Sequence, residues 1–160
     1  MKKLFSRTAL ILSLCAVSSV AVAEDFPFKK QIVARQAFMQ VYAYNLGLLG
    51  AMAKGEADYD AKIATGAAGN LLAAAKMDNS TMWPKGSDAE APGLDGKTRA
   101  KTETWSTYPK VTEKHQDLTD ALIEMAAVAG NGLDAVKSNM GAVGKGCKGC
   151  HKSFRVPKDE

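Results

Sequence analysis

Cysteine and histidine are scarce in this chain of 160 residues, and their scarcity narrows the possible metal sites. The cysteines are Cys15, Cys147 and Cys150, and the histidines are His115 and His151. A structural zinc site needs four ligands, and a Cys pair beside its own His is not the usual zinc-finger spacing. We therefore do not expect a zinc protein.

Strand-like alternation, internal repeats and low-complexity tracts are also missing. A thioredoxin-like Cys-x-x-Cys site needs a βαβ setting, so the lack of strands argues against that interpretation of Cys147 and Cys150. Ala, Leu, Met, Lys and Glu dominate instead, and apolar residues recur at helical spacing. The expected fold class is all-α.

No apolar run is long enough to span a bilayer. The N-terminus has a basic start, an apolar stretch over residues 8–20 and an Ala-x-Ala site at residues 21–23. This pattern predicts a secretory signal peptide, residues 1–23, cleaved after Ala23. A lipoprotein leader through Cys15 is the alternative, which is disfavoured because bulky Leu14 stands where a small residue is needed.

A strong charge of one sign is absent from the mature chain. The net charge of +4 includes three basic leader residues, so residues 24–160 carry about +1. This balance gives no reason to expect a nucleic-acid partner or membrane insertion of the mature chain. The length suits one domain with its own core.

Four helices are predicted, over residues 27–54, 58–77, 103–129 and 133–154. Gly55 suits the end of the first helix, and Pro109 is expected to disturb the first turns of the third or to mark its true start. A long loop is expected over residues 78–99. Four amphipathic helices with mostly short connections predict an antiparallel bundle. The residues expected to face inward on the first helix are Ile32, Gln36, Met39, Ala43, Leu46 and Gly50, and on the second Tyr59, Ile63, Leu71 and Ala74.

The motif that carries chemistry is Cys147-Lys148-Gly149-Cys150-His151. It is the Cys-x-x-Cys-His pattern of c-type haem attachment. Two thiols on one helical turn can each add to a vinyl group of one porphyrin, and the adjacent imidazole can then face the iron. The sequence therefore predicts one covalent haem c, with His151 as an axial iron ligand.

The scarce cysteines and histidines allow two other interpretations. A disulfide between Cys147 and Cys150 is conceivable in an exported chain, but across two intervening residues it would be strained. His115 is expected to be a solvated residue of the third helix rather than a second iron ligand.

The position of the motif, nine residues from the end of a four-helix chain, resembles the class II c-type cytochromes, the cytochrome c-prime family. The resemblance extends over nearly the whole mature chain. Its other short stretches are residues 35–36, 54–60, 83–86, 97–105 and 143–155. It implies a periplasmic four-helix bundle, often a homodimer, with the haem held between helices.

Several further site residues follow from this resemblance alone. Arg35 matches the arginine of the family that contacts a haem propionate, and Gln36 and Glu103 stand where family members line the haem edge. Arg155, one helical turn after His151, is expected beside the imidazole.

Met39 occupies the position of the distal residue in this resemblance. Most members place an apolar or aromatic residue there, leave the iron five-coordinate and bind nitric oxide or carbon monoxide. A low-spin branch supplies methionine as the sixth ligand and looks like electron carriers, and residues 49–56 resemble that branch. Met39 as a packing residue only is the alternative.

We therefore expect a periplasmic electron carrier with His151/Met39 ligation and redox proteins as its partners. The alternative is a five-coordinate, high-spin protein that binds nitric oxide or carbon monoxide. No enzyme and no catalytic residue are expected, because a peroxidase needs distal acid–base groups and no histidine is near Met39 in the sequence.

Overall fold

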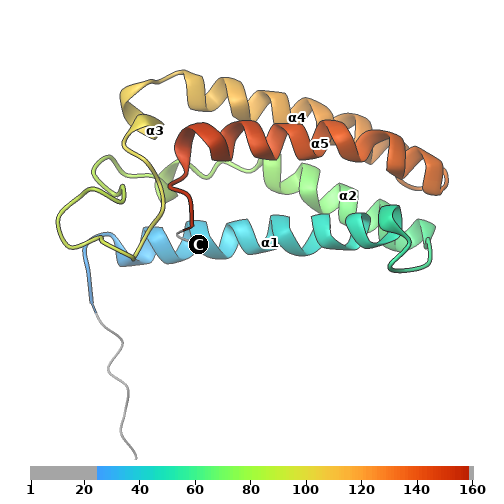
Figure 1. Cartoon of the computed structure of the whole chain (residues 1–160), viewed down its shortest axis with the longest axis horizontal. Helices are drawn as coiled ribbons and strands as arrows, with labels where there is room; N and C mark the ends of the chain where they lie inside the picture. The colour runs from blue at the N-terminus through green and yellow to red at the C-terminus, as the bar shows by residue number, and fades with distance from the viewer. Residues whose placement is uncertain (1–24, 159–160) are drawn as a thin grey trace, which may run out of the picture.

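Helices make up nearly all the regular structure of residues 25–158, the part of the chain that this computed structural model describes. The four long ones form an antiparallel bundle (Figure 1). This confirms the expected all-α, four-helix architecture. The predicted signal peptide and its cleavage site lie outside the described residues. The elements are α1 (Lys29–Lys54), α2 (Ala61–Lys76), the 3-10 helix η1 (Ser80–Met82), α3 (Glu103–Ser106), α4 (Lys110–Val128) and α5 (Leu133–Phe154).

The short connection between α1 and α2 is built from local signals. Gly55 ends α1 in the left-handed region, at φ 76°, where glycine carries no steric penalty. The Asp60 side chain then accepts a hydrogen bond from the backbone N–H of Ile63, at 2.9 Å, and caps α2. These two ends place α1 and α2 side by side.

The predicted helix over residues 103–129 is wrong as a single element. It is divided into α3 and α4, and Pro109 stands immediately before α4. Proline has no N–H to donate and its ring crowds the preceding turn, so the helix cannot run through it. The expected disturbance at Pro109 is confirmed.

Small residues let the helices approach closely. The buried face of α2 consists of alanines and one leucine, which pack against Leu49, Met52, Leu122 and Met125. A Cβ atom at position 146 of α5 would lie 2.9 Å from the Cα of Leu118, so only glycine allows α4 and α5 this contact. α5 is thus held against α4 immediately before Cys147.

The predicted inward stripe of α1 is only partly buried. Gln36, Met39 and Ala43 are exposed, although Ile32 is buried as expected. On α2, Ile63 is 46% exposed rather than inward. The buried residues of α1 are Ile32, Arg35, Phe38, Asn45, Leu49 and Met52. Apolar residues occur on several sides of α1, so periodicity alone does not select the buried face.

A single antiparallel bridge closes the C-terminal end of the bundle. After α5 the chain turns toward α1 (Figure 1), and Arg155 pairs with Ala100. The N–H of Lys101 donates to the carbonyl of Phe154 at 3.0 Å, and that of Val156 donates to the carbonyl of Arg99 at 2.8 Å. Within residues 25–158, no helix is both long and apolar enough to cross a bilayer.

Tyr59 connects the two turns at the other end of the bundle. Its hydroxyl donates to the carbonyl of Ala129 at 2.9 Å and accepts from the N–H of Gly132 at 3.0 Å. Tyr59→Phe is expected to lower the free energy of unfolding by about 1–3 kcal/mol, because both backbone groups lose a partner. Urea denaturation measures this, and Tyr44→Phe, at a 69% exposed position, is the matched control. Equal stabilities of the two variants would contradict the proposed role of Tyr59.

Candidate functional site

The motif residues of α5 lie on the last two turns of the helix. Both Cys147 and Cys150 are free and half-buried, while His151 is exposed. Burial raises the pKa of both thiols, and the proximity of Cys147 raises that of Cys150 further. Both sulfurs are therefore protonated near neutral pH. Over residues 25–158, His, Cys, Asp and Glu form no group of three or more that could hold a metal ion.

α1 and α5 run antiparallel, and one contact sets their register. A Cβ atom at Gly50 would lie 3.9 Å from Cε of Met140. Eleven residues back along α1 stands Met39, and eleven residues forward along α5 stands His151. Eleven residues make about three helical turns. Met39 therefore points to the same side of α1 as Gly50, and His151 points to the same side of α5 as Met140. Met39 and His151 thus stand at the same level on facing sides of the two helices.

A second contact agrees with this register. Tyr42 of α1 is near enough to Cys147 of α5 for the thiolate form to raise the pKa of the phenol. Burial is the larger cause, and together they raise the pKa of Tyr42 to about 12. The ring of Phe38 packs edge-on against that of Tyr42, with centroids 5.3 Å apart. The sequence analysis missed Tyr42, although its spacing of three residues from Met39 is a signal of a shared helix face.

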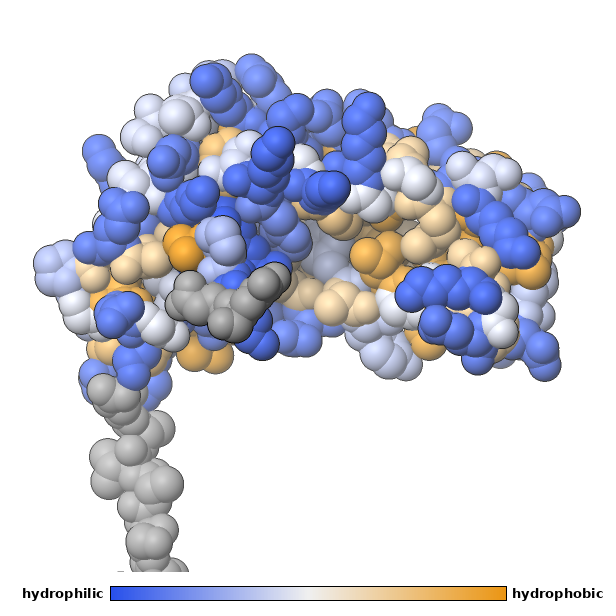
Figure 2. Space-filling view, viewed as in Figure 1, coloured by the Kyte–Doolittle hydropathy of each residue, from blue (hydrophilic) through white to orange (hydrophobic). Residues whose placement is uncertain are grey.

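The two helices are not in side-chain contact throughout this register. Gly50 and Met140 are half-buried, whereas Met39 is 40% exposed and His151 is exposed. The surface is hollowed between α5 and α1 (Figure 2). His151 lines an open space, and Cys147 and Cys150 lie within about one helical turn of it on α5. Two thiols and an imidazole in this arrangement fit a covalently attached haem.

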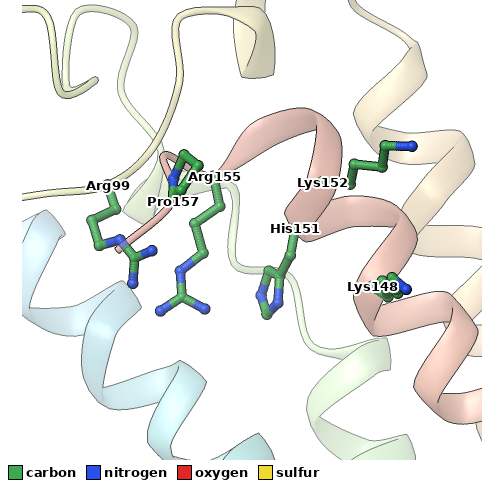
Figure 3. Close-up of a pocket in the computed structure, with 6 residues that line it drawn as sticks. All are labelled: Arg99, Lys148, His151, Lys152, Arg155 and Pro157. Atoms are coloured by element: carbon green, nitrogen blue, oxygen red, sulfur yellow. The ribbon is translucent and has the colours of Figure 1, made fainter. Parts of the chain in front are cut away.

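A basic cavity of about 370 Å³ lies on the His151 side of α5. The side chains of His151 and Arg155 both project toward the side of α1 (Figure 3). Partial burial of the ring lowers the pKa of His151, and Arg155 and Arg99 lower it further. The imidazole is therefore held neutral, which is the form that binds a metal. The cavity is lined by Arg99, Lys148, His151, Lys152, Arg155 and Pro157.

Arg99 is a site residue that the sequence analysis did not identify. Its Nε donates to the carbonyl of Val156 at 2.9 Å, across the bridge that joins Ala100 to Arg155. It comes from a loop more than fifty residues before His151, and no local motif marks it. Arg155 lines the same cavity as His151, as its spacing of four residues predicts.

Arg35 is buried, and its guanidinium is bonded within the protein. Nη1 donates to Oγ of Ser87 at 2.7 Å, and Nη2 donates to the Ser87 carbonyl and, at 2.6 Å, to Oγ1 of Thr98. The guanidinium carbon lies 4.9 Å from the ring centroid of Trp83. Burial lowers the pKa of Arg35, and nearby Asp88 partly offsets that effect. Arg35 therefore fastens the loop after η1 to α1.

The other two residues expected at the haem edge lie near the same loop. Nε2 of Gln36 donates to the carbonyl of Lys97 at 2.9 Å, and Glu103 is exposed at the first turn of α3. Roles of Arg35, Gln36 and Glu103 toward a propionate or the haem edge remain predictions.

Arg35→Lys is expected to lower the free energy of unfolding by about 2–4 kcal/mol. The variant keeps the charge but cannot reproduce the three hydrogen bonds of the planar guanidinium, so the Ser87 carbonyl and the hydroxyls of Ser87 and Thr98 lose their charged donor. Hydrogen exchange should accelerate at Ala89, whose N–H donates to the Ala100 carbonyl at 2.8 Å. Lys30→Met, at an exposed position of α1, is the control. Unchanged exchange at Ala89 would contradict the fastening role.

His115 was expected to be solvated, and that expectation is wrong. Its side chain is half-buried, and Nε2 lies 2.8 Å from the carbonyl oxygen of Ala75. It joins α4 to the end of α2. The pattern of α4 did not reveal this partner because Ala75 is forty residues away.

Comparison with known proteins agrees with this geometry. A family model described as Cytochrome C' matches residues 30–155. The chain is 36% identical to a cytochrome c-554 of Cereibacter sphaeroides over 127 residues, 79% of this chain and 93% of that protein. A solved cytochrome c' from Rhodobacter sphaeroides is 32% identical, with a TM-score of 0.77, covering 82% of this chain and 98% of that one.

A more distant solved structure is a ferrous variant of cytochrome c' from Alcaligenes xylosoxidans with bound NO. It is 25% identical, with a TM-score of 0.68, and the match covers 84% of this chain and 100% of that chain.

Proposed function

Because the chain belongs to the cytochrome c' family, whose members bind one covalent haem c each, we propose that it is a low-spin electron carrier with His151 and Met39 as its axial iron ligands. The covalent haem predicted from the sequence is thereby confirmed. Thioether bonds from Cys147 and Cys150 would hold the group to α5. When bound, haem supplies a one-electron couple, Fe(III)/Fe(II).

One observation carries the choice of Met39. Met39 and His151 stand at the same level on facing sides of α1 and α5, and both are exposed there. A buried packing role for Met39 would leave its side chain among the core residues, where Phe38 lies instead. The exposed thioether of Met39 is therefore available to coordinate the iron of a haem held between the helices.

The protein's own side chains set the properties of the site. The neutral imidazole of His151 would donate an electron pair from one ring nitrogen to the haem iron. Arg155 and Arg99 oppose protonation of this imidazole. The thioether of Met39 is a soft ligand that favours ferrous iron, so this pair raises the reduction potential. The rings of Phe38 and Tyr42 cover the core side of α1 at this level.

The family contains electron carriers and gas-binding haem proteins rather than typical enzymes. The side chains that stand near Met39 on the inward side of α1 are the rings of Phe38 and Tyr42 and the hydrogen-bonded guanidinium of Arg35. None of them is a group with a pKa near neutrality. We therefore assign no catalytic residue.

Binding of nitric oxide or carbon monoxide is the second candidate function. It is favoured by the 40% exposure of Met39, which leaves this side chain free to move away from the space beside it. The cytochrome c' from Alcaligenes xylosoxidans with bound NO supports the same candidate. The two functions differ in one bond, between sulfur and iron.

The absorption spectrum of the purified ferric holoprotein at neutral pH tests the proposal. Sulfur–iron coordination predicts a low-spin spectrum with the weak long-wavelength band of this ligand pair. It also predicts that the ferrous form takes up carbon monoxide slowly, because the gas must displace the thioether. A high-spin ferric spectrum with rapid uptake would establish the gas-binding alternative instead.

We further propose export to the periplasm, with removal of residues 1–23, and a homodimer formed through the outward side of α1. That side presents Val33, Val41 and Tyr44, which are 51%, 46% and 69% exposed. Mass spectrometry of the mature chain tests cleavage after Ala23. Sedimentation of the wild type and of Val41→Lys tests the dimer, which the lysine should dissociate.

A further inference from the structure

Four exposed cations mark the second half of α5 and its end: Lys145, Lys148 and Lys152 on the helix, and Arg155 directly after it. Residues three and four apart on a helix are neighbours on its surface, so the three lysines form one row, which Arg155 extends at the end of the helix. We call it the basic row. Hydrophilic side chains are gathered along α5 above the hollow (Figure 2).

The basic row is not neutralised within residues 25–158. Ion pairs join Lys54 to Glu56 and Lys114 to Asp117, and neither pair includes a member of the row. Arg99 adds a fifth cation at the cavity, close enough to lower the pKa of Arg155. An exposed acidic row follows the neighbouring helix α4 instead, formed by Glu113, Asp117, Asp120 and Glu124. Charges of the two signs are therefore separated on adjacent helices.

The basic row also flanks the residues that attach the cofactor. Lys148 directly follows Cys147, and Lys152 directly follows His151. Consecutive residues of a helix point in directions about 100° apart, so Lys148 and Lys152 lie on the face of α5 next to that of Cys147 and His151. The cavity beside them is concave and lined by cations from α5 and by Arg99 from the bridge (Figure 3).

We propose that the basic row is the docking surface for an acidic protein that exchanges electrons with this one. The proposal rests on the electron-carrier function above and names the kind of partner. Unpaired cations attract an oppositely charged surface over a Debye length and raise the rate of encounter. Among the side chains of the row and the lining of the cavity beside it, Pro157 is the apolar residue, which is too little to enter a bilayer.

Stopped-flow reduction of the ferric holoprotein tests this, with flavodoxin hydroquinone as the acidic protein probe. The test variant is Lys148→Glu/Lys152→Glu. The matched control is Lys62→Glu/Lys76→Glu, which changes the net charge equally at two exposed positions of α2. α2 packs on α1 and α4 and has no extensive contact with α5.

At about 10 mM ionic strength, where the Debye length is about 30 Å, the test variant should react roughly tenfold or more slowly than wild type. The control variant should change by less than about threefold. At about 1 M the three rates should converge, because the Debye length falls to about 3 Å. Both double variants must keep the absorption spectrum and the reduction potential of the wild type, so that a change in rate reports docking. If the charge-reversed chain does not mature, Lys148→Gln/Lys152→Gln replaces it.

Equal slowing of both double variants would overturn the proposal, since net charge alone would then explain the rates. No slowing of either would overturn it too. Co-sedimentation with phosphatidylglycerol vesicles that is lost in the test variant would favour a membrane surface. Self-association at low salt that is lost in the test variant would favour the acidic row of a second copy as the partner.

Titration of the ferric holoprotein with oxidised flavodoxin separates this proposal from the electron-carrier function. Binding that is weakened only in the test variant supports docking, whatever the spin state of the iron. Binding in this titration without reduction of the haem by flavodoxin hydroquinone in the stopped-flow experiment would contradict the electron-carrier function and leave the docking surface intact.

Discussion

Replacing both thiols, in Cys147→Ala/Cys150→Ala, is expected to abolish covalent haem attachment. These are the only cysteines after residue 23, and their spacing of three places both on one helical turn of α5. Acid–acetone extraction followed by mass spectrometry should find wild-type chain heavier by one haem and variant chain without added mass. Each single variant should keep at most one thioether bond and lose haem more readily.

The two histidines provide a matched pair for the same measurement. His151→Ala should stop or greatly reduce haem loading, because the exposed imidazole between Cys150 and Arg155 is the proposed proximal ligand. His115→Ala should load normally and lose only some stability, since His115 bonds to the Ala75 carbonyl between α4 and α2. Full loading of the His151 variant, or of the double cysteine variant, would contradict the assignment of the site.

Met39→Leu is expected to turn the protein from an electron carrier into a gas binder. Leucine has nearly the volume of methionine but no donor atom, so packing is kept while the sulfur ligand is lost. The ferric spectrum should become high-spin, and the reduction potential should fall by something on the order of 100 mV, since axial ligands set potentials over about 0.8 V.

The larger expected effect of Met39→Leu is on the affinity of the ferrous form for carbon monoxide. If the sulfur–iron bond is worth about 3 kcal/mol, its loss should raise the affinity for the gas roughly 100-fold, because each 1.4 kcal/mol is a factor of ten. Met77→Leu is the matched control, since Met77 is 43% exposed, close to the 40% of Met39. Identical spectra and gas affinities for wild type and Met39→Leu would refute coordination by Met39.

The core of the site could be predicted because it is local. Cys147, Cys150 and His151 lie within five residues, so their arrangement on α5 follows from helix geometry alone. Helix α5 has the predicted bounds, residues 133–154, because Gly132 precedes it at φ 120° and breaks the chain there. Pro109 likewise marked the break before α4.

The partners of Arg35 could not be predicted in the same way. A charged residue on a helix is expected at the surface, and Arg35 is instead buried against Ser87 and Thr98, more than fifty residues away. Its burial is tolerable because Nη1 and Nη2 donate three hydrogen bonds to Ser87 and Thr98 and the guanidinium stacks on Trp83. Such compensation exists only in the folded chain.

By itself the amino-acid sequence determined an all-helical chain, one haem c and the residues that attach it, because helical periodicity and a five-residue motif are local properties. Only the tertiary structure decided which residues of α1 are buried, how near Tyr42 lies to Cys147, and how the Ala100–Arg155 bridge brings Arg99 to the cavity. These features depend on helix rotation and register. Packing between distant residues, such as Gly146 against Leu118, sets both, and no local preference of the chain encodes them.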